Sequence, residues 1–74
     1  MKLNRFVAAL IQRQDGHSGE EFATTLGVSA AQWSRVRNGK QQPTRDMILL
    51  ALRLWPELAY VLARDAEDSK EATP

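Results

Sequence analysis

The chain has 74 residues, of which 43% are hydrophobic and 26% are charged, and this composition is typical of a single globular domain. It contains no cysteine and one histidine, His17, so we expect neither a disulfide framework nor a bound metal. The longest apolar run, residues 6–11, is far shorter than the roughly 20 residues that span a bilayer, and no signal-peptide pattern follows it. These features predict a cytoplasmic protein with no cofactor and no membrane contact.

The formal net charge of +1 is distributed unevenly along the chain. Residues 1–64 carry nine basic and five acidic groups, whereas residues 65–74 carry four acidic groups and one lysine. The stretch 29–45 has no acidic residue and four basic ones, which are Arg35, Arg37, Lys40 and Arg45. Such a cationic segment attracts phosphates, although a solvated basic loop would have the same composition.

Apolar residues at helical spacing predict an all-α fold of five helices, and no strand pattern competes with it. The first helix is expected over about residues 3–14 and the second over about 19–26. The third follows Ser29 for about nine residues, the fourth follows Thr44, and the fifth runs from Pro56 to about residue 66. Residues 1–66 therefore form the predicted domain, and residues 67–74 a flexible acidic tail.

One face of each predicted helix carries the apolar side chains that should build the core. These are Leu3, Phe6, Val7, Leu10 and Ile11, then Phe22, Ala23 and Leu26, then Trp33 and Val36, then Met47, Ile48, Ala51 and Leu52, and finally Leu58, Val61 and Leu62. The pattern predicts a single small core to which every helix contributes.

The second and third helices are separated by a short turn with its own signals. Ser18 stands three residues before Glu21 in a capping-box arrangement, and Gly27 is suited to the left-handed conformation that ends a helix. Ser29 is a good N-cap for the next helix. Two helices joined by three or four residues that include glycine have the geometry of a helix-turn-helix.

The third helix has a buried and an exposed side when its residues are placed 100° apart around the axis. Trp33 and Val36 define the buried side, whereas Ala30 and Gln32 lie on the flanks. The outward positions hold Ala31, Ser34, Arg35 and Asn38. The small and polar side chains of this outward face would contribute little to a hydrophobic core, and they are suited to lie against a nucleic-acid groove.

Residues 19–38 resemble the DNA-binding core of the phage Cro and lambda repressor-like family, also called the XRE family. The likeness extends over roughly residues 3–54 and is most specific from Gly27 to Thr44. The matching residues are Phe22, Ala23 and Leu26, then Gly27-Val28-Ser29, then Trp33 and Val36, then Asn38-Gly39-Lys40, and finally Pro43-Thr44. The resemblance implies a compact five-helix lambda repressor-like domain that binds double-stranded DNA.

The resemblance also implies which side chains meet the DNA. Base edges would be contacted by Ala30, Ala31, Gln32 and Arg35. Phosphates would be contacted by Gly19 through its backbone amide, and by Ser34, Asn38, Lys40, Gln41 and Thr44. Arg35 is the strongest candidate for base recognition, because its planar fork can donate two hydrogen bonds to a guanine, and Gln32 could pair with an adenine in a similar way.

The sequence departs from the family pattern at two places. Trp33 stands where relatives usually carry isoleucine or valine, and it needs more room between the helices. Relatives often pair an acidic residue of the third helix with an arginine of the first, and those places here hold Arg37 and Gln12. Arg37 lies near the edge of the predicted core, which favours a hydrogen-bonded structural role over base contact.

The fifth helix carries more apolar surface than one inward stripe requires, so we expect it to join two copies in a symmetric homodimer. The predicted interface consists of Trp55, Leu58, Tyr60 and Leu62, although Trp55 could instead cover the core. Two copies would present their third helices to successive major grooves about 34 Å apart.

Three functions agree with these features. The first is a small repressor of a phage or mobile element, Cro-like or autoregulatory, that binds an inverted-repeat operator. The second is the antitoxin of a toxin-antitoxin pair, which would hold a toxin through the acidic residues 65–74. The third is a helical protein-interaction module without DNA binding. An enzyme is not expected, because no carboxylate pair, nucleophile-base set or phosphate-binding glycine loop is evident.

Overall fold

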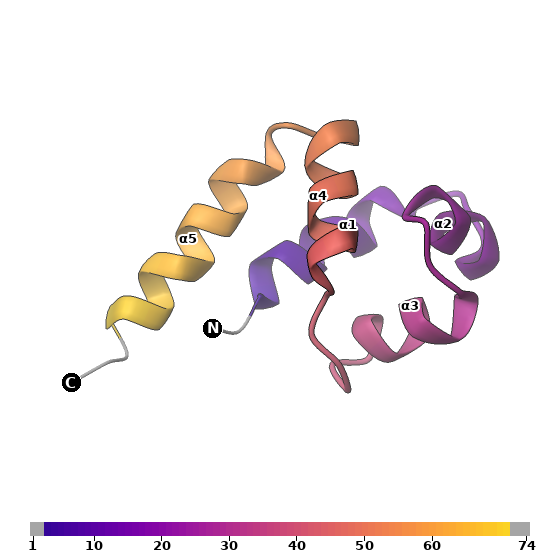
Figure 1. Ribbon diagram of the computed structural model, residues 1–74, viewed down its shortest axis with the longest axis horizontal. Coiled ribbons are helices and arrows are strands. Elements are labelled where there is room, and N and C mark those ends of the chain that lie inside the picture. The colour runs from indigo at the N-terminus through magenta and orange to yellow at the C-terminus, as the bar shows by residue number, and fades with distance from the viewer. Residues whose placement is uncertain (1–2, 72–74) are drawn as a thin grey trace.

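The computed structural model describes the backbone of residues 3–71 and the side chains of residues 3–67. Within these residues it contains five α-helices and no strand, which confirms the predicted all-helical architecture (Figure 1). The helices are α1 (Asn4–Arg13), α2 (Gly19–Thr25), α3 (Ala30–Arg37), α4 (Arg45–Leu54) and α5 (Leu58–Glu71). None of them is both long enough and apolar enough to cross a membrane.

Three of the helices begin at a hydroxyl side chain, as the sequence predicts. The side-chain oxygens of Ser18, Ser29 and Thr44 each accept a hydrogen bond from the amide three residues later, at 3.1, 3.1 and 3.3 Å. Each bond satisfies an amide that has no partner inside its own helix. The starts of α2, α3 and α4 are therefore fixed by local sequence.

Glycine ends both α2 and α3 in the same way. Gly27 and Gly39 have φ angles of 71° and 77°, in the left-handed region that side chains with a Cβ rarely adopt. The Val28 amide then donates to the Ala23 carbonyl at 2.9 Å, and the Lys40 amide donates to the carbonyl five residues before it, also at 2.9 Å. These are Schellman closures, and they reverse the chain direction directly after each helix.

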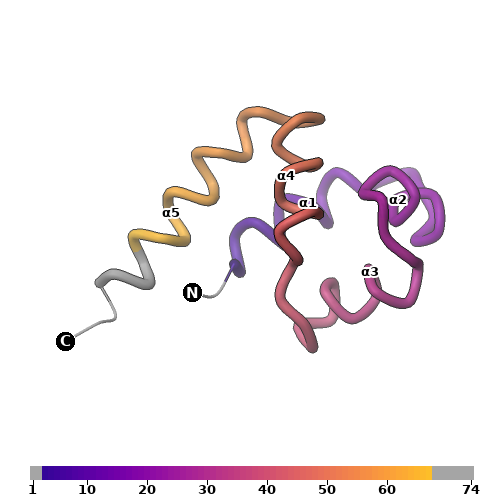
Figure 2. Tube along the Cα trace, in the orientation of Figure 1, coloured from indigo at the N-terminus to yellow at the C-terminus, as the bar shows by residue number. Residues whose placement is uncertain are grey.

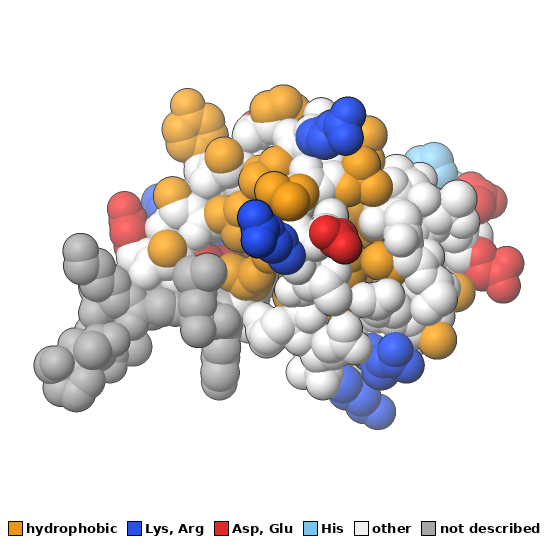
Figure 3. Space-filling view, viewed as in Figure 1, with side chains coloured by type: hydrophobic (Ala, Val, Ile, Leu, Met, Phe, Trp, Pro, Cys, Tyr) orange, Lys and Arg blue, Asp and Glu red, His pale blue; other side chains and the backbone are white. Residues whose placement is uncertain are grey.

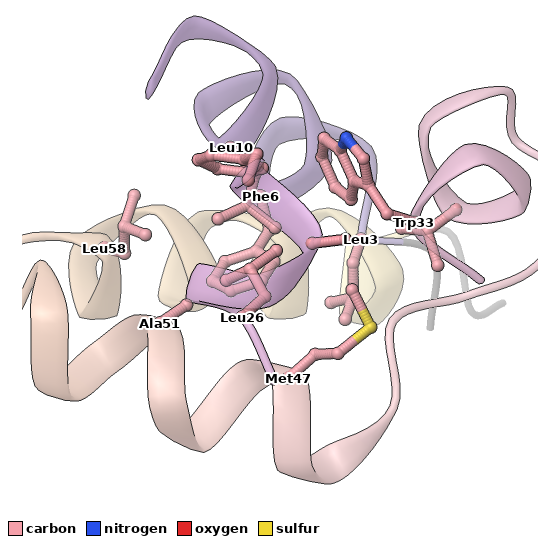
Figure 4. Close-up of a cluster of buried hydrophobic side chains, with 11 residues drawn as sticks. Leu3, Phe6, Leu10, Leu26, Trp33, Met47, Ala51 and Leu58 are labelled. Carbon is pink, nitrogen blue, oxygen red and sulfur yellow. The ribbon is translucent and has the colours of Figure 1, made fainter. Parts of the chain in front are cut away.

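The core lies where α1 to α4 and the start of α5 meet, and Figure 4 shows its side chains converging from these helices. Its buried members are Leu3, Phe6, Leu10, Phe22, Ala23, Leu26, Trp33, Val36, Met47, Ala51 and Leu58. The other predicted core residues are partly buried and pack against this cluster: Val7, Ile11, Ile48, Leu52, Val61 and Leu62.

Trp33 is accommodated in the core because it finds both an aromatic and a polar partner. Its ring centroid lies 4.9 Å from that of Phe22, with the two planes inclined by 54°. Its indole Nε1 donates a hydrogen bond of 2.9 Å to Oε1 of Gln14, a buried side chain at the end of α1. The tryptophan therefore joins α3 to both α2 and α1.

The start of α1 is capped by a side chain from the other end of the chain. Asp65 of α5 is only 2% exposed, and its two carboxylate oxygens accept hydrogen bonds from the amides of Arg5 and Phe6 at 3.1 and 2.9 Å. The residue before α1, Leu3, makes no side-chain cap bond. Asp65 was counted among the acidic residues 65–74 that could hold a toxin, and the structure instead buries it against the start of α1.

The boundaries of α5 differ from the prediction at both ends. The helix begins at Leu58 rather than at Pro56, whose carbonyl accepts from the Ala59 amide at 3.1 Å in a tight turn. It continues to Glu71, five residues beyond the predicted end. Residues 67–71, predicted to belong to a flexible tail, are helical, and residues 72–74 of that predicted tail lie outside the described part.

Along the long axis of the molecule the helices occupy two ends and a middle. Figure 2 shows α2 and α3 at one end of the long axis and α5 at the other, with α1 and α4 between them. α1 packs against both α3 and α5, so it connects the two ends.

Candidate nucleic-acid interface

α3 presents one side to the core and the other to solvent. Trp33 and Val36 are each 1% exposed, whereas Ala31, Ser34 and Arg35 are exposed. The flanking Ala30 is also exposed, and Gln32 is half-buried. The predicted division of this helix into an inner and an outer side is therefore confirmed, and the outer side is free to contact another molecule.

The turn between α2 and α3 consists of residues 26–29 and fixes the orientation of α3. Leu26 is buried in the core at its start, and Val28 packs against the core in its middle. Because two apolar anchors and two buried residues of α3 hold the pair of helices, the exposed face is carried on a firmly packed support.

Two hydrogen bonds connect the exposed face of α3 to the segment that follows it. Arg35 Nε donates to Gln41 Oε1 at 3.1 Å, and Asn38 Nδ2 donates to Ser34 Oγ at 3.3 Å. Sequence analysis assigned Arg35 to base contact and the other three residues to phosphate contact. The structure brings all four together on one surface.

The loop from residue 38 to residue 44 is attached to the domain at several points. Gln42 Oε1 accepts a hydrogen bond from the Leu3 amide at 3.0 Å, and Pro43 is buried. Thr44 is half-buried and caps α4. Lys40 is exposed at the turn of the loop, so its ammonium group is free to contact an anion.

Opposite charges lie on neighbouring parts of the surface. Figure 3 shows basic side chains projecting at the edge formed by α3 and the following loop, and acidic side chains at the edge formed by α2. Glu20 and Glu21 occupy the first turn of α2, and the Glu21 carboxylate lies 3.5 Å from Nδ1 of His17. These carboxylates flank Gly19 and would repel a phosphate there, so its backbone amide is less suited to the predicted contact.

Arg37 occupies a different position from the one that its place in the sequence suggested. It is exposed, and we find no hydrogen bond or ion pair from its guanidinium within the described residues, so the predicted hydrogen-bonded role is wrong. Arg37 and Gln12 line the same open hollow, together with Asp15 and His17. The positions of Gln12 and Arg37 thus border one hollow, and no ion pair joins them.

The predicted dimer residues fall into separate environments. Leu58 is fully buried in the core of its own protomer, so its assignment to an interface is wrong. The Trp55 ring stacks on Phe22 at 5.9 Å, and the Arg13 guanidinium lies 5.7 Å from its centroid, which favours the covering of the core. Leu62 is half-buried, whereas Tyr60 is 79% exposed.

No family model, curated protein or solved structure matches the chain significantly.

Sequence reasoning found the residues of this surface but not the bonds between them. Arg35 and Gln41 are six residues apart and come together only because Gly39 reverses the chain. Gln42 gave no signal at all, since a glutamine in a loop has no characteristic pattern. The sequence feature that indicates this turn is the Asn38-Gly39 pair. It predicts that the chain reverses there but not which side chains the reversal brings together.

Proposed function

We propose that α2 and α3 form a helix-turn-helix that binds double-stranded DNA, with the exposed face of α3 in the major groove. The observation that carries this proposal is the combination of an anchored helix, an outer face without acidic groups, and an adjacent loop that exposes Lys40. Phosphate attraction supplies most of the affinity of such surfaces, and base contacts supply the specificity.

The dimensions of α3 support this placement. An α-helix with its side chains is about 10–12 Å in diameter, which fits a major groove about 12 Å wide, and the eight residues of α3 extend about 12 Å along the axis. Small side chains at Ala30 and Ala31 let the start of the helix approach the bases closely and contact a thymine methyl group. Gln32 and Arg35 then supply the hydrogen bonds, to adenine and guanine respectively.

Positioning on the duplex would come from the remaining polar groups of this surface. Lys40 is a direct phosphate ligand in this proposal because it is exposed and carries a full charge. The other phosphate contacts are Ser34, Asn38, Gln41 and Thr44, with Gly19 the least favoured. These assignments are the ones that the sequence likeness to Cro and lambda repressor-like proteins implies.

We propose the same biological role that this likeness implies, which is a small transcriptional repressor acting by occupancy of its operator. One eight-residue helix covers only a few base pairs, so a homodimer on an inverted repeat would give the necessary affinity. Such a repressor works in the prokaryotic cytoplasm and needs no ligand domain.

The exposed tyrosine supplies the best candidate contact for that homodimer. Tyr60 and Leu62 are two residues apart, which places them about 200° apart around α5, so a single partner helix cannot cover both. Tyr60→Ser should raise the dimer dissociation constant at least about tenfold in sedimentation equilibrium. Leu49→Ser, which removes another exposed apolar side chain, is the matched control and should change it little. Equal behaviour of the two variants would remove α5 from the interface.

Fluorescence anisotropy with duplex DNA across a salt series tests the function itself. Affinity should fall as salt rises, with a logarithmic slope of about −0.9 for each phosphate that is neutralised. Lys40→Ala should make this slope shallower by about one, whereas Arg53→Ala, at the end of α4 remote from α3, should leave it unchanged (Figure 1). Binding that is absent or insensitive to salt contradicts DNA binding and would favour a protein-interaction module.

A further inference from the structure

We propose that Gln41 is a positioning residue that holds Arg35 ready to recognise guanine, an inference that rests on the proposed DNA binding. Sequence analysis assigned Gln41 only to a phosphate. The hydrogen bond from Arg35 Nε to Gln41 Oε1, at 3.1 Å, gives this glutamine a second role within the protein.

The backbone keeps these two side chains together. The Lys40 amide donates to the carbonyl of Arg35 itself at 2.9 Å, and Gly39 adopts the φ of 77° that this closure requires. The residue after Gln41 is tied to the Leu3 amide, and Pro43 beyond it is buried. Gln41 is therefore presented to Arg35 by a closed turn with a second attachment.

The position of this bond on the guanidinium decides what Arg35 can still bind. An arginine can donate two parallel hydrogen bonds either from Nε and one Nη or from its two Nη atoms. Gln41 occupies Nε, so the first arrangement is blocked and only the terminal pair remains. That pair matches O6 and N7 of guanine in the major groove.

Holding the guanidinium in this way also lowers the entropic cost of binding. An exposed arginine loses rotamer freedom when it is immobilised, and a bond already present in the free protein removes part of this cost. The amide nitrogen of Gln41 keeps both hydrogens for a phosphate, because only its oxygen faces Arg35. Gln41 can thus contact a DNA phosphate and at the same time hold the arginine that recognises a base.

The experiment measures guanine discrimination rather than affinity alone. A preferred duplex is first selected from a random DNA pool. Each guanine in it is then replaced in turn by 7-deazaguanine, which lacks the N7 acceptor. At the guanine recognised by Arg35, the replacement should weaken the binding of the unchanged protein about tenfold or more. The same replacement should cost Arg35→Ala less than about twofold.

Gln41→Ala should reduce the discrimination to about threefold or less, while thermal unfolding followed by circular dichroism should be unchanged, because both side chains lie at the surface. Gln41→Glu offers two carboxylate oxygens, which can accept from Nε and one Nη together and so occupy a nitrogen that guanine needs. It should therefore discriminate poorly, and it should bind every duplex more weakly because it lacks the amide donors and adds a negative charge. Gln12→Ala, an exposed glutamine on α1, is the matched control and should behave like the unchanged protein.

The result that would overturn the proposal is full guanine discrimination in Gln41→Ala, or a selected duplex in which no guanine is sensed by Arg35. In either case salt-dependent DNA binding would persist, so the proposed function would stand while this inference fell. If the unchanged protein shows no salt-dependent DNA binding, both the proposed function and this inference are overturned. The failure of the inference alone can therefore be distinguished from the failure of the proposed function.

Discussion

The junction of α1 with α5 and the outer face of α3 use polar residues in opposite ways. At the junction, the Asp65 carboxylate is buried and both of its oxygens are bonded to amides of α1. On α3, the polar side chains are exposed, and Arg35 keeps its two terminal nitrogens free of the bond to Gln41. The polar groups at the junction are bonded within the fold, whereas most of those on the outer face of α3 remain able to bond another molecule.

This difference separates stability from function along the molecule. A buried carboxylate is tolerated only because the amides donate hydrogen bonds to it. A substitution that removes these bonds should therefore lower the free energy of unfolding. An exposed polar side chain contributes little to folding and can be replaced without unfolding the domain. Substitutions at the junction should therefore lower the stability of the fold, whereas substitutions on the outer face of α3 should change the binding of another molecule.

The largest effect is expected from Asp65→Ala. It removes two charge-assisted hydrogen bonds and leaves the Arg5 and Phe6 amides without partners at the start of α1. The free energy of unfolding measured in urea should fall by about 3 kcal/mol. Asp65→Asn, which keeps one acceptor oxygen, should lose less. A loss below about 0.5 kcal/mol for the alanine variant would show that Asp65 does not hold α5 to α1.

A somewhat smaller loss is expected from Trp33→Phe. The change leaves a space beside Phe22 and removes the donor that satisfies the buried Gln14 oxygen. Together these effects should cost about 2 kcal/mol in chemical denaturation. Adding Gln14→Leu should recover part of the loss, because the unpaired oxygen is then gone; a further loss instead would contradict the importance of this bond.

The smallest of the three effects is expected from Ser29→Ala. This variant removes the cap of α3, which accepts from the Gln32 amide at 3.1 Å, and should cost about 1 kcal/mol. Ser34→Ala on the exposed face of the same helix is the control and should change stability by less than about 0.5 kcal/mol. Equal losses in thermal unfolding would mean that the face of α3 also supports the fold.

The parts of the fold that the sequence predicted are those governed by neighbouring residues. Helix starts at Ser18, Ser29 and Thr44 and the reversals at Gly27 and Gly39 involve partners within five residues, so local rules suffice. The inner face of α3 also followed from periodicity alone, because helical geometry determines which residues share a side.

The parts that could not be predicted depend on residues far apart in the chain. Asp65 lies about sixty positions from the amides that it caps, and nothing in its local sequence indicates these partners. Leu58 and Tyr60 looked equally apolar in sequence, yet only the packing of α5 on α1 determines which of them is buried. Arg37 was misplaced because an angle around a helix does not show how far the neighbouring helices extend.

The central claim is that the outer face of α3, and not the opposite end of the molecule, contacts DNA. Titration of the isotope-labelled protein with a duplex, followed by amide chemical shifts, tests it most directly. The account predicts that, with a duplex that carries a single half-site and therefore binds one copy, the largest shifts fall on residues 29–41 and the amides of α5 change little. Large shifts confined to α4 and α5, with those of α3 unchanged, would contradict it.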